Sequence, residues 1–90
     1  MDKNQSPIVE ALRQIPGVTV ETGHDDILCG YNLRTYWFEL KSGNATSKKT
    51  GKVLESHIEP DQKRIRDLYT GHYSIVSSLD EILKEIGING

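Results

Sequence analysis

The 90-residue sequence contains a single cysteine, Cys29, and no long hydrophobic run. One cysteine excludes an internal disulfide, and a transmembrane helix needs roughly 18 or more consecutive apolar residues. The first five residues are polar and lack the apolar stretch of a signal peptide. These absences predict a protein of the reducing cytoplasm that does not cross a membrane. Cys29, beside Ile27 and Leu28, is expected to be an ordinary buried thiol.

Neither positive nor negative residues are in large excess, because the formal net charge is −2. That value argues against a chain that binds polyanions through its overall charge. Residues 41–66 differ, since seven basic against three acidic residues give this segment a local charge of +4 (7 − 3). The bases are Lys41, Lys48, Lys49, Lys52, Lys63, Arg64 and Arg66. Two interpretations stay open, a phosphate-binding surface or a merely solvated loop and helix face.

The length predicts one domain, residues 1–90, near the lower limit for independent folding. A chain this small buries only about 60% of its unfolded surface, so assembly into a homodimer would be a simple added stabiliser. Hydrophobic and charged fractions of 36% and 27% are typical of a globular domain.

Hydrophobic periodicity predicts helices that alternate with strands. We expect a helix opened by Ser6-Pro7 and stopped by Pro16-Gly17, because Ser is a frequent N-cap and Pro a frequent first helical residue. The other expected elements are strands over 18–22, 26–30, 34–41 and 72–76, a helix over 60–68, and a last helix behind the capping box of Ser78 and Glu81. Residues 42–57 read as a long polar loop without periodicity. This order predicts an α/β domain whose mixed sheet is flanked by helices.

The second and third expected strands should form a hairpin that places Asp26 opposite Glu39. A two-residue and a four-residue turn give the same register, because the paired residue numbers add up to 65 in both. Directly opposed residues have Cβ atoms about 4.5–5.5 Å apart, so the two carboxylates would repel each other without a cation between them. Two carboxylates fit Mg²⁺ or Mn²⁺. Alternation also places Trp37 and Lys41 on the side of Glu39.

These residues carry a family resemblance. Asp26-Ile27-Leu28 followed by Phe38-Glu39-Leu40-Lys41 resembles the Asp…Glu-x-Lys signature of the PD-(D/E)XK nuclease superfamily, and the expected element order resembles its αβββαβ core. Two further segments resemble the VRR-NUC branch, namely Glu59-Pro60-Asp61-Gln62 and the run from Tyr73-Ser74-Ile75-Val76 to Leu79-Asp80-Glu81. The resemblance extends from about Gly17 to Ile86. Asp25 stands where the family has proline.

The resemblance implies a restriction-endonuclease-like fold and a Mg²⁺- or Mn²⁺-dependent endonuclease that hydrolyses DNA phosphodiesters. Asp26 and Glu39 would hold the metal with the backbone carbonyl of Leu40. Lys41 would orient or activate the attacking water, and Gln62 would support that water or the scissile phosphate. Lys48, Lys49, Lys52 and Lys63 would contact the DNA backbone. Stand-alone relatives imply a dimer that acts on branched or flapped DNA, such as a four-way (Holliday) junction, and many of them are phage-encoded and act in the bacterial host.

Plainer interpretations remain for the same residues. Glu39 and Lys41 could form a surface ion pair of little energetic weight, and Gln62 could be an ordinary exposed helix residue. Trp37 and Tyr36 could stack on a base or on a partner subunit, or belong to the core. Asp25 is expected to be a turn residue, and His24 beside it more often binds neither metal nor phosphate. Whether the first-helix acid Glu10 takes part stays open.

Two functions of other classes also remain open. The chain could be a catalytically silent nucleic-acid-binding module on the same fold, which need not respond to Mg²⁺. It could instead be a protein-interaction adaptor, which would bind no DNA even at low salt.

Overall fold

The computed structural model describes residues 5–23, 26–42 and 45–88. In these ranges the chain forms α1 (Gln5–Arg13), β1 (Thr19–Thr22), β2 (Asp26–Tyr31), β3 (Arg34–Leu40), the short 3-10 helix η2 (Glu55–His57), α2 (Pro60–Leu68), β4 (Tyr73–Val76) and α3 (Leu79–Ile86). The strands form one sheet in the order β1-β2-β3-β4, with the first two pairs antiparallel and β4 parallel to β3. The predicted α/β domain with a mixed sheet is therefore confirmed.

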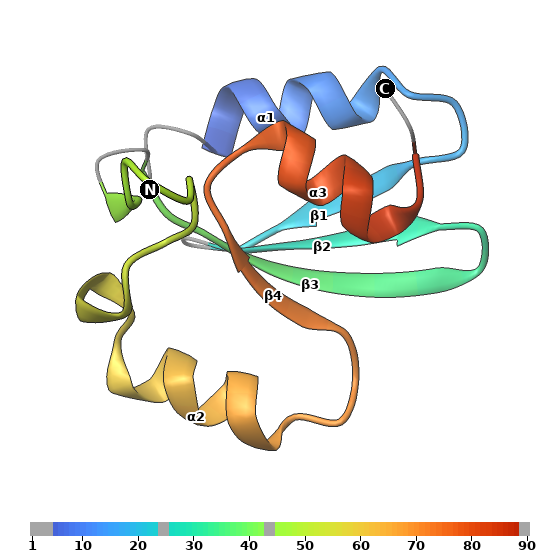
Figure 1. The fold of residues 1–90 in the computed structure, drawn as a ribbon. Helices are drawn as coiled ribbons and strands as arrows, with labels where there is room; N and C mark the ends of the chain where they lie inside the picture. The colour runs from blue at the N-terminus through green and yellow to red at the C-terminus, as the bar shows by residue number, and fades with distance from the viewer. Residues whose placement is uncertain (1–4, 24–25, 43–44, 89–90) are drawn as a thin grey trace.

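Helices lie on both faces of the sheet. α1 and α3 lie together on one face, and α2 lies on the other (Figure 1). None of the helices in the described ranges has the length and apolar character needed to span a bilayer.

The start predicted for the first helix is wrong, because Gln5 and Ser6 already lie inside α1. Pro7 remains compatible with the helix, since the first-turn N–H groups have no intrahelical acceptor anyway. After Arg13 the chain continues in a tight turn, where the N–H of Ile15 donates to the carbonyl of Leu12 over 3.1 Å. The helical segment ends just before Pro16-Gly17, as predicted.

The core lies between the sheet and the pair α1 and α3. Alternate residues of the central strands point into it, and these meet apolar residues of the two helices. The fully buried members include Leu12, Ile27, Cys29, Phe38, Leu40 and Ile82. Burial raises the pKa of the Cys29 thiol, which agrees with an ordinary buried cysteine. Tyr36 stacks on Phe38 within this core, at 6.2 Å between ring centroids.

The opposite sheet face is only partly covered. Alternation and register place on it Asp26 and Leu28 of β2, Trp37 and Glu39 of β3, and Tyr73 and Ile75 of β4. α2 packs over β4, and the β2 side is more open, since Leu28 is 45% exposed. The face that carries both candidate carboxylates is therefore the half-open one.

The β2–β3 hairpin has the predicted register, which runs from Tyr31 opposite Arg34 to Asp26 opposite Glu39. Its turn consists of Asn32 and Leu33, with φ angles of 54° and 65°. Two successive left-handed residues match the twist of antiparallel strands, so this turn type specifies a two-residue loop and with it the pairing. Leu33 is fully exposed, so the turn gains no burial from its side chain.

The segment predicted as an irregular loop contains local structure. Thr46 and Val53 form an antiparallel bridge, and the N–H of Ser47 donates to the carbonyl of Lys52 over 2.8 Å. Ala45 and Ile58 are buried, so they fasten both ends of the segment to the molecule. Sequence periodicity misses this structure because a turn of a few residues has no period to detect.

The last two helices begin close to the predicted positions. The hydroxyl of Ser78 caps α3 by accepting the N–H of Glu81 over 3.3 Å. The carboxylate of Glu81 accepts the N–H of Ser77 rather than that of Ser78, so the reciprocal half of the expected capping box lies one residue upstream. Gly87 ends α3 with φ of 90°, a left-handed conformation that suits glycine.

Replacing Leu33 by glycine should stabilise the protein, because glycine adopts the left-handed region without the steric penalty of a Cβ. We expect Leu33→Gly to raise the free energy of unfolding by about 1 kcal/mol, which corresponds to roughly 4–8 °C in Tm for a domain of this size. Thermal denaturation of both proteins measures the difference. An equal or lower Tm for the variant would contradict the two-residue turn.

Candidate functional site

Asp26 and Glu39 face each other across the β2–β3 ladder. Asp26 begins β2, Glu39 is the last residue but one of β3, and the register pairs them directly. Asp26 is partly buried and Glu39 is only 9% exposed. A carboxylate removed from water needs a cation or hydrogen-bond donors to offset its lost hydration. Two opposed carboxylates in such a position are the strongest candidate for a cation site in the molecule.

The indole of Trp37 contacts this pair directly. Its Nε1–H donates a hydrogen bond of 2.8 Å to Oδ2 of Asp26. Tyr73 of β4 packs edge-on against the indole at 4.8 Å between ring centroids, and Tyr69 at the end of α2 does so at 5.4 Å. Trp37 is thus neither a simple core residue nor a free stacking platform. Sequence reasoning missed its contact with Asp26, although cross-strand neighbours on one face are within reach of an aromatic side chain.

Gln5 and Gly23 hold the chain that leads into Asp26. The Nε2 group of Gln5 donates to the carbonyls of Gly23 (3.2 Å) and Asp26 (3.1 Å), and Gln5 itself is only 1% exposed. Gly23 donates its N–H to the carbonyl of Asp26 over 2.8 Å, and a Cβ at Gly23 would collide with Oδ1 of Asp26. The first-helix residue that reaches this turn is Gln5, whereas Glu10 is exposed on α1. Neither contact had a sequence signal.

Lys41 follows β3 directly and continues its ladder. Its N–H donates to the carbonyl of Val76 over 2.8 Å, so the strand alternation extends to Lys41 and places it on the face of Glu39. The side chain of Lys41 is partly buried. Asp26, Glu39 and Lys41 therefore share one end of one sheet face, as the sequence predicted.

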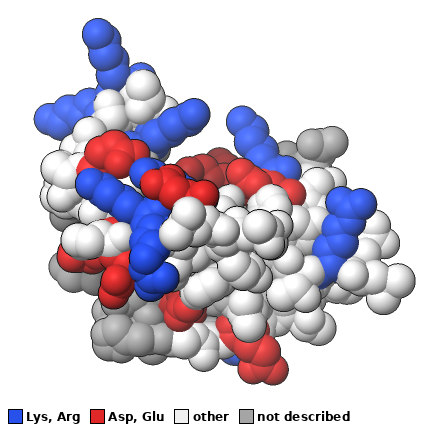
Figure 2. Space-filling view, turned by 90° about the horizontal axis from the view of Figure 1, so that it is seen from below, with Lys and Arg blue, Asp and Glu red and all other residues white. Residues whose placement is uncertain are grey.

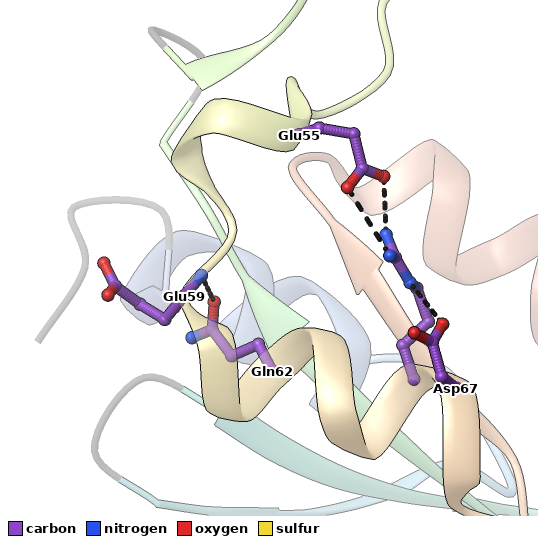
Figure 3. A network of polar contacts seen from close by, with 5 residues as sticks. Glu55, Glu59, Gln62 and Asp67 are labelled. Carbon is purple, nitrogen blue, oxygen red and sulfur yellow. Dashed lines mark hydrogen bonds and ion pairs between the residues drawn. The ribbon is translucent and has the colours of Figure 1, made fainter.

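Gln62 lies in the first turn of α2, where it caps the helix. Its Oε1 accepts the backbone N–H of Glu59 over 3.0 Å, and Figure 3 shows the amide turned back toward that backbone. This bond satisfies an otherwise unpaired donor at the helix start. The capping contact uses only the amide oxygen, so the NH₂ group of Gln62 is not consumed by it.

Basic and acidic side chains are intermixed around α2. Arg66 pairs with Glu55 at 2.6 Å and with Asp67 at 3.4 Å, and Arg64 lies 3.8 Å from Asp61. The hydrogen bond from Arg66 is the main cause of the lowered pKa of Glu55. Figure 3 shows Glu55 and Asp67 on either side of the guanidinium. These pairs leave the net charge of the segment at +4, but they spread acidic groups among its arginines.

Three of the four lysines proposed for DNA contact lie on one turn, and the fourth lies on α2. Lys48, Lys49 and Lys52 are exposed on the turn of residues 47–52, and Lys63 is partly buried on α2. Seen from the side of α2, the described surface shows blue and red side chains next to each other rather than one basic area (Figure 2). Any polyanion on this face would have to follow separate lysines.

The donor set fits a small, hard cation with few protein ligands. Among the described residues no group of three or more His, Cys, Asp and Glu side chains is arranged to hold a metal ion. Mg²⁺ is commonly held by one or two carboxylates while water completes its octahedral shell. Asp26 and Glu39 meet that requirement, and the partial exposure of Asp26 leaves room for solvent. Protein zinc sites usually include cysteine sulfur or histidine nitrogen, whereas this pair offers carboxylate oxygens.

The hydroxyl of Tyr73 lies buried next to this pair. Burial, together with the negative charge of Glu39 and a hydrogen bond with its side chain, raises the pKa of the Tyr73 hydroxyl above its usual value of 10.0. Tyr73 therefore remains a neutral donor at every physiological pH, and sequence reasoning had not singled it out.

A cavity of about 590 Å³ lies elsewhere, along the outer edge of β4. The residues around it include Lys52, Glu55, Arg66, Tyr73 and Glu81, and neither Asp26 nor Glu39 is among them. A pair of opposed carboxylates, one of them buried, needs a cation or donors whereas the cavity does not, so we place the candidate site at the pair.

The two described histidines, His57 and His72, lie away from the carboxylate pair in the contacts they make. His24 and Asp25 lie outside the described residues. His57 is exposed in η2. His72, for which the sequence offered no partner, lies 2.9 Å from a carboxylate oxygen of Glu85 and packs against Tyr36.

No family model, no curated protein and no solved structure matches the chain. The functional argument therefore depends on the geometry of the described residues.

Replacing Tyr73 by phenylalanine removes a buried ionisable hydroxyl that lies beside Glu39, and so it should change how the stability of the protein depends on pH. The raised pKa adds a pH dependence. The folded state keeps a proton that the unfolded state loses above its own pKa, so stability is constant below about pH 10 and falls as the pH rises further. We expect urea unfolding at pH 7 and above pH 10 to show a smaller alkaline loss for Tyr73→Phe than for the wild type.

Tyr69→Phe is the matched control, because Tyr69 is 50% exposed and also contacts Trp37. It should leave the alkaline loss of stability unchanged. An alkaline loss as large for Tyr73→Phe as for the wild type would refute the prediction.

Proposed function

We propose that the chain is a metal-dependent nuclease that hydrolyses phosphodiester bonds in DNA. The observation that carries the proposal is the direct pairing of Asp26 with Glu39 on a half-open sheet face. Lys41 follows Glu39 on the same face, which supplies the positive charge that phosphoryl transfer requires. The proposal extends to the restriction-endonuclease-like fold and to the VRR-NUC branch that the sequence resembles.

The residues have separate roles in this proposal. Asp26 and Glu39 hold the metal with the backbone carbonyl of Leu40, and Lys41 orients the attacking water and balances charge on the phosphate. When bound, Mg²⁺ or Mn²⁺ polarises the phosphoryl oxygen and lowers the pKa of its water. The NH₂ group of Gln62, which the helix cap leaves available, supports the water or the scissile phosphate. Lys48, Lys49, Lys52 and Lys63 contact the DNA backbone.

The expected substrate is branched or flapped DNA, and the expected assembly is a homodimer. A half-open face accommodates an extended strand, and intermixed charges disfavour tight binding of any duplex by charge alone. Two sites related by a two-fold axis would suit the two strands of a four-way junction. This substrate class follows the family resemblance, as does action in the bacterial cytoplasm.

Cleavage of labelled four-way junction, flap and linear duplex DNA with Mn²⁺, Mg²⁺ or EDTA tests the proposal. Glu39→Gln keeps the volume of the side chain and removes its charge, so we expect the metal-dependent cleavage rate to fall by about 100-fold or more. Glu21→Gln is the matched control, because Glu21 is an exposed acid on the same sheet face, opposite Leu28. It should cut like the wild type.

Binding to the same DNAs in EDTA separates the alternatives. A protein that binds DNA but never cuts would be a silent binding module. A protein that neither binds nor cuts at low salt would be an interaction adaptor. Equal cutting by the wild type and Glu39→Gln would show that Glu39 is not part of the catalytic site.

A further inference from the structure

The carboxylate of Asp26 accepts a hydrogen bond from the neighbouring strand. Its Oδ2 accepts the indole N–H of Trp37, and a Cβ at Gly23 would have to displace its Oδ1. The backbone is held as well, because the carbonyl of Asp26 accepts hydrogen bonds from Gly23 and from Gln5. Such contacts fix both the place and the rotation of the carboxylate before any ligand arrives.

Two tyrosine rings flank the indole that donates to Asp26. Tyr69 and Tyr73 contact Trp37 edge-on, with interplanar angles of 87° and 76°. The ring of Tyr69 in turn lies over Gly71, where a Cβ would come within 2.6 Å of a ring carbon. Flanked in this way, the indole resists a change of rotamer that would withdraw its N–H from Asp26.

We propose that Trp37 is a positioning residue that makes Asp26 a one-oxygen ligand and thereby favours Mg²⁺ and Mn²⁺ over Ca²⁺. This inference rests on the proposed metal site. The indole N–H occupies one of the two lone pairs of Oδ2 and fixes the rotation of the carboxylate, which disfavours chelation of one ion by both oxygens. Ca²⁺ takes six to eight oxygens and readily binds carboxylates through both of theirs, whereas Mg²⁺ demands octahedral geometry with single oxygens.

Calorimetric titration with Mn²⁺ and with Ca²⁺ tests the role of Trp37 without any substrate. Trp37→Phe retains an aromatic ring and loses the donor. We expect its Mn²⁺ affinity to fall by about 10-fold or more, as is usual when a partner of a metal ligand is removed. The Ca²⁺ affinity should fall less or rise. The ratio of the Ca²⁺ to the Mn²⁺ dissociation constant should therefore be smaller in the variant than in the wild type. Leu28→Ala, opposite Trp37 on the same face, is the matched control and should leave the ratio unchanged.

A second variant keeps the test decisive if Trp37→Phe does not fold. Benzothienylalanine at position 37 has nearly the shape of tryptophan and lacks the N–H. It should therefore lower the ratio of the Ca²⁺ to the Mn²⁺ dissociation constant in the same way. Folded variants with wild-type constants for both ions would overturn the positioning role while the metal site stands. A wild type that binds neither ion would instead overturn the proposed function, and the inference with it.

Discussion

The structure of the candidate site depends on one cross-strand pairing, that of Asp26 with Glu39. The pairing is set at the far end of the hairpin, where Asn32 and Leu33 form a two-residue turn. A slip of one residue would send every side chain of a strand to the other face. Tyr36 and Phe38 would then leave the core, so the core and the acidic pair specify the same register. The hydrophobic effect thereby holds together two carboxylates that would otherwise repel each other.

Side chains from neighbouring elements hold the backbone and the carboxylate of Asp26 in place. α1 contributes Gln5, which holds the turn before β2 through two carbonyls. The indole of Trp37 holds the carboxylate of Asp26, and α2 and β4 supply the tyrosines that flank it. Trp37, Tyr69 and Tyr73 therefore form an aromatic cluster beside the carboxylates on this half-open face. The aromatic rings exclude water from one side of the carboxylates, and the β2 side stays open.

Local signals accounted for most of the fold. α2 runs from Pro60 to Leu68 as predicted, because a proline start and a break before Gly71 are both readable in a few residues. The register was predictable because a two-residue and a four-residue turn around Asn32 and Leu33 give the same pairing. Gln5 and Gly23 were not, since the contact between Gln5 and Asp26 joins residues 21 positions apart. The pairing of Arg66 with Glu55 was equally hidden, because it joins residues of two elements that the sequence count treated as one charged segment.

Crystallography of the protein with Mn²⁺ tests the central claim, that Asp26 and Glu39 share one divalent cation. The account predicts an anomalous manganese peak between the two carboxylates, about 2.1 Å from an oxygen of each, a distance characteristic of a small octahedral cation. The hydrogen bond from Trp37 to Asp26 should persist in that crystal. Manganese bound only elsewhere, or no peak at saturating Mn²⁺, would contradict the account.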